Sequence, residues 1–349
     1  MSSRTSLRLV PSASGTLAAL LLAAALFAQD PPERLGEIEF FGYFGIPLQP
    51  IRAALPLHEG DTIDLPQAQN QIKQSIRQST GQEPSDVAMV CCDNKGQWMI
   101  YIGLRGRSNR EFRYNAAPQG PAKLPASALK LYQRFVDANM ESVQKGQAGE
   151  DDSKGYALSE YPPFRAIQLE TRKYAVQHEP QIERVLETSA DVNQRRAAAE
   201  FLGYAQPSDA QLAGLAHAAR DPDSDVRNNA IRALGVLARF SPKVAAQIPA
   251  SEFIAMLNSG SWSDRNKCGL LMLQLTASRD PKLLGELRDQ AFESLIEMAR
   301  WRSPGHSASY RMIVGRIAGI EEKTLEDLVE QGKIQAIFEA LGLAANEHK

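Results

Sequence analysis

The chain of 349 residues carries a formal charge of −2, with 39 Lys and Arg against 41 Asp and Glu. A balance this close to zero gives no electrostatic basis for binding nucleic acid or an anionic membrane surface. Hydrophobic residues make up 43% of the chain, enough to form a core. The length exceeds what one core usually holds, so we expect two domains.

The first 28 residues have the layout of a secretory signal peptide. Arg4 and Arg8 precede an apolar run at 16–28, and small Ala28 closes this run before Gln29. The run is shorter than the roughly 20 residues that a membrane-spanning helix needs. We therefore expect cleavage of residues 1–28 and a periplasmic or secreted protein. Contact with a membrane is expected only if residues 16–28 stay uncleaved.

The three cysteines do not suggest a disulfide framework. Cys91 and Cys92 are adjacent, and a bond between neighbours would close a strained ring that a regular strand cannot accommodate. We expect all three to be reduced, with Cys268 buried in a helix. No pair has the spacing of a zinc site, and we expect neither a metal nor a cofactor.

Residues 35–108 predict a small α+β domain. The segment Glu37 to Phe40 alternates polar and apolar residues, as in a strand with one buried face. Further elements follow in chain order: a short helix after Pro47, a second helix from Leu65, and strands at 87–92 and 98–104 joined by the turn Asp93-Asn94-Lys95-Gly96. The predicted order is β-α-α-β-β.

This order, together with A-L-P-L-H-E-G-D at Ala54 to Asp61, resembles a POTRA domain. Such modules are found in outer-membrane assembly proteins, secretion partners and division proteins. The resemblance implies that the strand at 87–92 forms a sheet edge to which an extended peptide can add by main-chain hydrogen bonds. The transmembrane β-barrel that often follows these modules is not found downstream.

The sheet of this domain should have a second apolar face. With helices on one face, alternation places five side chains on the other face or beside it: Phe41, Tyr43, Val90, Met99 and Tyr101. A solvated face should be polar. Two hypotheses remain: this face packs on the rest of the chain, or it binds a partner protein. We take these five residues as candidate partner-binding residues.

A linker at 109–160 follows and includes an amphipathic helix. Helical spacing predicts this helix at 126–144, with an apolar stripe formed by Leu129, Tyr132, Phe135, Val136, Met140 and Val143. The three consecutive acids Glu150, Asp151 and Asp152 lie in a loop and are expected to be solvated rather than to bind a cation.

Residues 161–349 contain an internal repeat. The sequences R-R-A-A-A-E-F-L-G from Arg195 and R-N-N-A-I-R-A-L-G from Arg227 are related by an offset of 32. A looser copy at an offset of 38 places Cys268 where the second copy has Ala230. Helical pairs of this size must stack on their neighbours, which predicts an all-α solenoid.

The second copy, with D-P-D-S-D-V-R before its apolar positions, resembles a HEAT repeat of the short bacterial type also found in phycobilin lyases. In that family the Arg after the turn commonly bonds an Asp of the same or an adjacent turn. The resemblance therefore implies structural roles for Arg195, Asp223, Asp225 and Arg227, and for the small buried positions Ala230 and Cys268.

No sequence motif brings a nucleophile, a base and an orienting group together, and no Gly-rich phosphate loop is present. We expect no catalytic residues. The predicted function is an exported, non-enzymatic scaffold or adaptor in the cell envelope that binds a protein partner and no nucleic acid. The alternatives are a membrane-tethered division or secretion component with an uncleaved N-terminal helix, and a lyase-like enzyme or enzyme subunit.

Overall fold

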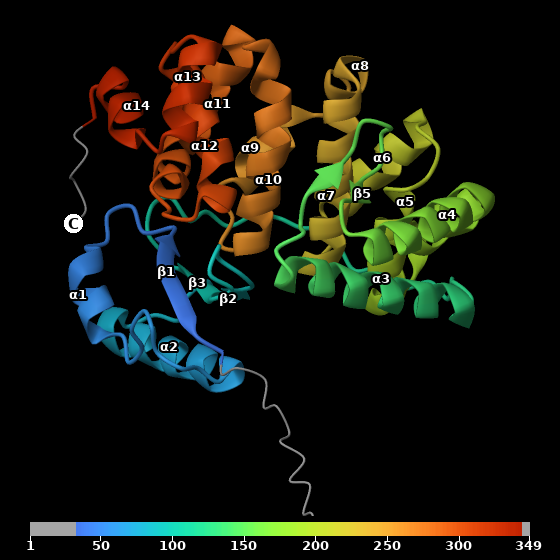
Figure 1. Cartoon of the computed structure of the whole chain (residues 1–349), viewed down its shortest axis with the longest axis horizontal. Helices are drawn as coiled ribbons and strands as arrows, with labels where there is room; N and C mark the ends of the chain where they lie inside the picture. The colour runs from blue at the N-terminus through green and yellow to red at the C-terminus, as the bar shows by residue number, and fades with distance from the viewer. Residues whose placement is uncertain (1–32, 344–349) are drawn as a thin grey trace, which may run out of the picture. The chain divides into compact units, whose positions relative to one another are not determined.

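The computed structural model of the protein describes residues 33–343 (Figure 1). The predicted signal peptide lies outside the described residues. None of the helices within residues 33–343 combines the length and the apolar character that crossing a bilayer requires.

The N-terminal module, residues 35–108, has the predicted order of elements. These are β1 (Leu35–Phe41), α1 (Leu48–Ala54), α2 (Leu65–Thr80), β2 (Asp86–Val90) and β3 (Trp98–Gly103). The strands lie in the order β1-β3-β2. Strand β3 pairs parallel with β1 and antiparallel with β2, so β1 and β2 are the two edges of the sheet.

Local sequence explains the helices of this module. Asp64 caps α2 by accepting a hydrogen bond from the Gln67 main-chain N–H, and Gly81 ends the helix in the left-handed conformation with φ of 73°. Ile72 and Ile76 lie one turn apart on the buried side of α2. They pack with Ile38, Phe40, Val87, Ile100 and Ile102 on one face of the sheet.

The other face of the sheet is covered by the chain itself. Phe41, Met99 and Tyr101 are buried and belong to a core that continues through the C-terminal helices. Of the two hypotheses for this face, the structure therefore agrees with packing on the rest of the chain. A small sheet with one helical layer could not bury both faces alone, so the repeats supply the second layer.

The rest of the chain is mostly helical, and Figure 1 shows its helices following one another in chain order. They are α3 (Ala126–Gln144), α4 (Pro162–Thr188), α5 (Val192–Leu202), α6 (Asp209–Ala218), α7 (Ser224–Phe240), α8 (Pro242–Ala245), α9 (Ala250–Met256), α10 (Trp262–Leu275), α11 (Pro281–Ala299), α12 (Pro304–Ile317), α13 (Glu322–Glu330) and α14 (Ile334–Ala340). A 3-10 turn, η1 (Thr276–Ser278), follows α10, and two short strands, β4 (Glu150–Asp151) and β5 (Leu158–Ser159), form a hairpin before α4.

The predicted repeats coincide with stacked helices. Helix α7 packs on α5 and α10, and the three equivalent small residues Ala198, Ala230 and Cys268 are fully buried. The third copy follows at the longer offset, and the additional residues form the segment that holds α8. The predicted burial of Ala230 and Cys268 is confirmed.

Helix α3 has the predicted bounds, and its predicted stripe is confirmed only in part: Phe135 is buried, whereas two other members are exposed. Val136 and Met140 are 40% and 44% exposed. The buried side is formed by Leu131 and Phe135 together with small residues, of which Ala138 is one. Small side chains let α3 approach α4 closely, and this packing outweighs the apolar character of the stripe.

The prediction of three reduced cysteines is corrected for two of them. Cys91 and Cys92 form a disulfide, and the peptide bond between them is cis. Our objection applied to a regular strand, whereas β2 ends at Val90, immediately before the pair. Cys268 is the free, buried cysteine of the described residues.

Replacing Ala230 by Leu should overpack the contact between α7 and its neighbours. Since Ala230 is 0% exposed, we expect a loss of about 1 to 3 kcal/mol in the free energy of unfolding. The exposed Ala213 on α6 provides a matched control, and Ala213→Leu should change stability by less than about 0.5 kcal/mol. Equal unfolding midpoints in urea for the two variants would contradict the packing of the repeat.

The cysteines should differ in their reaction with iodoacetamide. In native protein without a reductant we expect no labelling, because Cys91 and Cys92 are joined and Cys268 is buried. A mild reductant should add two labels, and denaturation should add the third. Peptide mass spectrometry counts the labels, and rapid native labelling of Cys268 would argue against the position given to α10.

Candidate functional site

The linker segment, residues 107–124, lies along the turns between the repeat helices. Its main-chain contacts with the repeats run in reverse chain order: Ser108 O accepts from Arg265 (2.6 Å) and Ser294 (3.0 Å), Arg110 N donates to Asn258 O (2.8 Å), Asn115 N donates to Arg220 O (2.7 Å), and Gly120 N donates to Thr188 O (2.7 Å). The repeats thus bind an extended stretch of their own chain, antiparallel to the order of the repeats.

A row of buried arginines holds these turns in place. Arg195 forms two hydrogen bonds with Asp221 (2.8 and 3.1 Å), and Arg227 forms two with Asp264 (2.8 and 3.2 Å). Each guanidinium also donates to main-chain carbonyls at the end of the preceding helix, such as Asp221 O for Arg227. Bidentate pairs of this kind fix orientation as well as supplying energy.

The residues predicted to be structural take part in this arrangement with one change of partner. Asp223 caps α7 and pairs with Arg196 rather than Arg227. Asp225 is also near Arg196, at 3.2 Å. The family pattern allows a partner in the same or an adjacent turn, and Arg227 takes the second option with Asp264 at the start of the next repeat.

A third buried arginine joins the repeats to the N-terminal module. Arg265 lies 3.4 Å from Glu297, and both side chains are fully buried. The Glu297 carboxylate also accepts hydrogen bonds from Gly42 N (2.8 Å) and Ser108 Oγ (2.6 Å). Burial raises the pKa of Glu297, while Arg265 and these hydrogen bonds oppose the rise. One carboxylate thus contacts the end of β1, the linker segment and α10.

Aromatic contacts complete the junction. The Tyr101 ring lies 5.2 Å from Trp262 and 4.8 Å from Trp301, and its hydroxyl is 2.6 Å from Nδ1 of His306. Trp301 Nε1 donates to Phe40 O at 2.9 Å. Burial lowers the pKa of His306 to about 4, and the nearby Lys267 acts in the same direction.

The five candidate partner-binding residues are not found on a free surface. Phe41, Met99 and Tyr101 face the repeats, and Val90 is partly buried against the same core. Tyr43 lies in the core on the opposite, helix-covered side of the sheet. Alternation does not extend to Tyr43, because β1 ends at Phe41 and Gly42 turns the chain with φ of 69°.

The two edges of the sheet differ. Along β1, side chains bond to the outward main-chain groups. The N–H of Ile38 donates to Glu59, and the N–H of Gly42 donates to Glu297. The carbonyl of Ile38 accepts from Arg52 and Arg302, and that of Phe40 accepts from Trp301.

The outer edge of β2 has fewer such contacts. Gln69 donates to Val87 O at 2.8 Å. Residues two apart in a strand point the same way, so the N–H and C=O of Met89 also lie on the outer side. No strand within residues 33–343 pairs there, and Ala88 to Cys92 are partly exposed.

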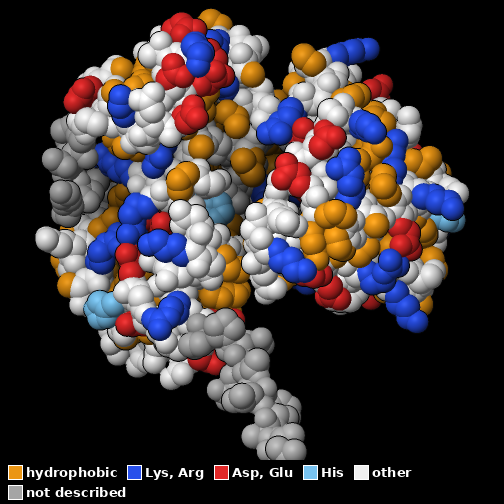
Figure 2. All heavy atoms as spheres, in the orientation of Figure 1, with side chains coloured by type: hydrophobic (Ala, Val, Ile, Leu, Met, Phe, Trp, Pro, Cys, Tyr) orange, Lys and Arg blue, Asp and Glu red, His pale blue; other side chains and the backbone are white. Residues whose placement is uncertain are grey.

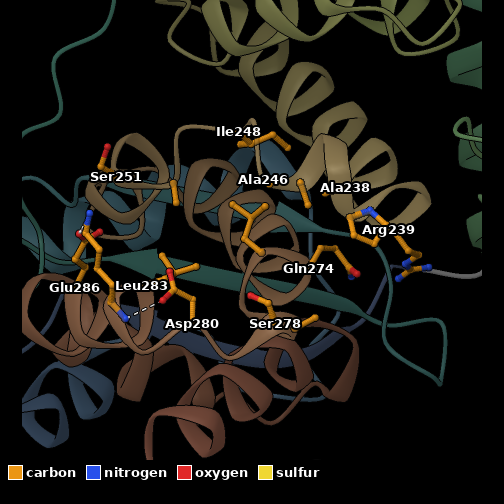
Figure 3. A pocket seen from close by; sticks show the side chains of 16 residues that line it. Ala238, Arg239, Ala246, Ile248, Ser251, Gln274, Ser278, Asp280, Leu283 and Glu286 are labelled. Carbon is orange, nitrogen blue, oxygen red and sulfur yellow. Dashed lines mark hydrogen bonds and ion pairs between the residues drawn. The ribbon is translucent and has the colours of Figure 1, made fainter.

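A cavity of about 790 Å³ opens beside α8 (Figure 3). Figure 3 shows Asp280, Leu283 and Glu286 on one side, with Ala238 and Arg239 on the other. Five alanines contribute to its wall: Ala238, Ala245, Ala246, Ala250 and Ala277. No His or Cys lines this cavity.

The described part of the chain brings no three His, Cys, Asp or Glu side chains together as a metal site.

A comparison with family models agrees with the repeats predicted from the sequence. A family model described as HEAT repeats matches residues 179–250. This match includes the copies at Arg195 and Arg227, so HEAT-type repeats are confirmed for this stretch. No curated protein matches the chain.

Three solved structures of repeat proteins or engineered proteins are similar at low identity. An engineered protein of a structural genomics consortium is 14% identical, with 64% of this chain and 91% of that chain covered and a TM-score of 0.37. A designed armadillo repeat protein is 13% identical, covering 54% and 89%, with a TM-score of 0.34. A computationally designed armadillo repeat protein for modular peptide recognition is 14% identical, covering 63% and 94%, with a TM-score of 0.33.

Sequence reasoning missed His306, Trp262 and Trp301 at the junction. All three contact Tyr101, which is distant in sequence. The sequence contains no pattern that assigns these residues to the junction, because an aromatic residue in the repeat region is ordinarily taken as part of the local core.

The low pKa of His306 predicts a loss of stability in acid. The folded state keeps the imidazole neutral to about pH 4, whereas the unfolded state binds a proton near its ordinary pKa of 6.5. The stabilising contribution is therefore complete above pH 6.5 and is lost as the pH falls to 4, by about 1 to 3 kcal/mol. His306→Gln should reduce the difference in unfolding free energy between pH 7 and pH 4.5, and the exposed His58→Gln should not. Identical pH profiles would contradict the burial of His306.

Proposed function

We propose that this chain is an exported, non-enzymatic adaptor of the cell envelope, and that a segment of its protein partner adds as a strand to β2. The repeat fold is typical of protein-interaction scaffolds. The resemblance of residues 35–108 to a POTRA domain supports strand addition as the mode of binding.

The observation that carries this proposal is the difference between the two edges of the sheet. Side chains close the edge of β1, whereas β2 presents the N–H and C=O of Met89 and a row of apolar residues without a strand partner. Unpaired strand edges bind extended chains readily, and proteins usually shield them when no partner is intended.

The linker segment provides support from within the chain. It shows that the repeats can hold an extended chain by main-chain hydrogen bonds, as at Asn115 and Gly120. Because this row of turns is already occupied, an external partner is better placed at β2. Export rests on the pattern of residues 1–28, and the non-enzymatic role rests on the lack of a catalytic motif in the sequence.

Substitution of Met89 tests the role of the edge. Met89→Pro and Met89→Ala remove the same side chain, but only the proline variant removes the outward N–H. With a photoreactive group at Ala88 and crosslinking in cells, we expect Met89→Pro to lower partner capture several-fold and Met89→Ala to retain it. Both should have melting temperatures within a few degrees of each other. Equal capture of the partner by the two variants would contradict strand addition at β2.

A further inference from the structure

Three consecutive acids of the linker form ion pairs with the repeats. Each acid pairs with a different arginine: Glu150 with Arg232, Asp151 with Arg165 at 4.0 Å, and Asp152 with Arg239 at 3.0 Å. Glu150 and Asp151 are exposed, in line with the predicted solvated loop, and Asp152 is partly buried. All three nevertheless lie against a basic surface of the repeats, and Figure 2 shows acidic and basic side chains interleaved where Figure 1 places β5 and α7.

This surface, which we call the basic strip, consists of Arg165 of α4, Arg232 and Arg239 of α7, and Lys267 of α10. Arg232 keeps a second partner in the buried Glu200, at 3.7 Å. Lys267 forms no hydrogen bond or ion pair with the rest of the described chain. Burial lowers the pKa of Lys267 to about 8, and the neighbouring Arg232 adds to this effect. Without the three acids, the basic strip would hold a clear excess of positive charge.

The tip of the hairpin, residues 147–155, is held weakly. Its two strands have two residues each, and its three ion pairs are all partly open to water. The arginine and acid side chains are 40% and 45% exposed for Arg165–Asp151, 55% and 18% for Arg239–Asp152, and 24% and 30% for Arg232–Glu150. Exposed ion pairs contribute little to stability because water and salt screen them. The base of the hairpin, from Ala157 to Ser159, is buried. The tip can therefore lift from the repeats while its base stays in place.

Apolar side chains border the basic strip. Phe240, which is 43% exposed, lies beside Gly155 of the hairpin. Leu270, which is 39% exposed, occupies on α10 the repeat position that Arg232 occupies on α7. A free inorganic anion would use the arginines alone. A peptide that carries both acidic and apolar residues would use the arginines and these two side chains together.

We propose that the basic strip is a docking site for an acidic peptide segment of a partner protein, and that the hairpin tip occupies the site as an internal competitor. Charge complementarity on the structure identifies the occupant, because the chain itself presents consecutive carboxylates there. This site is separate from the edge of β2 and goes beyond the proposed strand addition.

The test compares the natural chain with the triple variant Glu150→Gln, Asp151→Asn, Asp152→Asn, which keeps the size of the tip and removes its charge. The probe is a fluorescent synthetic peptide with the sequence of residues 147–155, and its Gln and Asn counterpart is the uncharged control. Since its own carboxylates no longer compete for the arginines, the triple variant should bind the acidic probe about tenfold more tightly than the natural chain. The gain should shrink as salt is raised. No gain, or equal binding of the uncharged peptide, would overturn the proposal.

Further variants separate the basic strip from other surfaces. In the triple variant, adding Arg165→Gln and Arg239→Gln should abolish the gain, while Arg134→Gln on α3 should leave it unchanged. Arg134 is a matched control because it forms an exposed pair with Glu170 away from the hairpin. Circular dichroism confirms folding of each variant.

Two competitors test the chemical class of the partner. Duplex DNA or anionic phosphatidylglycerol vesicles that displace the probe as well as unlabelled acidic peptide would show a general polyanion surface and would overturn the assignment to a peptide. The edge of β2 is unchanged in all these variants. Failure here therefore leaves strand addition intact, and Met89→Pro should not alter binding of the acidic probe.

Discussion

The buried carboxylate of Glu297 is the contact on which the arrangement of the chain depends. It accepts hydrogen bonds from the end of β1 and from the linker segment, and it neutralises the fully buried Arg265 of α10. A buried charge is tolerated only when its partners are in place, so loss of any one of them is costly. The N-terminal module and the repeats consequently share one core, and β2 is held at a fixed place beside α10.

Elements defined by neighbours in the sequence could be predicted. The order β-α-α-β-β, the turn at Asp93 to Gly96 and the bounds of α3 follow from alternation, helical spacing and turn residues, which depend on a few adjacent positions. The repeats could be found for a related reason, since Ala198, Ala230 and Cys268 face the same environment three times.

Features that join distant segments could not be predicted from the sequence. Alternation showed that one face of the sheet is apolar, but it does not say what covers Met99 and Tyr101. The pairing of Arg227 with Asp264 depends on the exact stacking of two repeats. The acids at Glu150 to Asp152 look like a solvated loop until the arginines of α4 and α7 are brought beside them. In each case the deciding contact is set by tertiary packing, which local propensity does not encode.

Because both faces of β3 are buried in the finished protein, the order of synthesis affects how safely the chain folds. Ribosomes make the N-terminal module first, whereas α10, α11 and α12, which cover Phe41 and Tyr101, emerge more than 150 residues later. If the sheet forms before the repeats are present, it has an uncovered apolar face beside an unpaired strand edge. This combination favours aggregation. The chain would therefore depend on a chaperone, or on delayed folding, until the last repeats are available to cover the sheet.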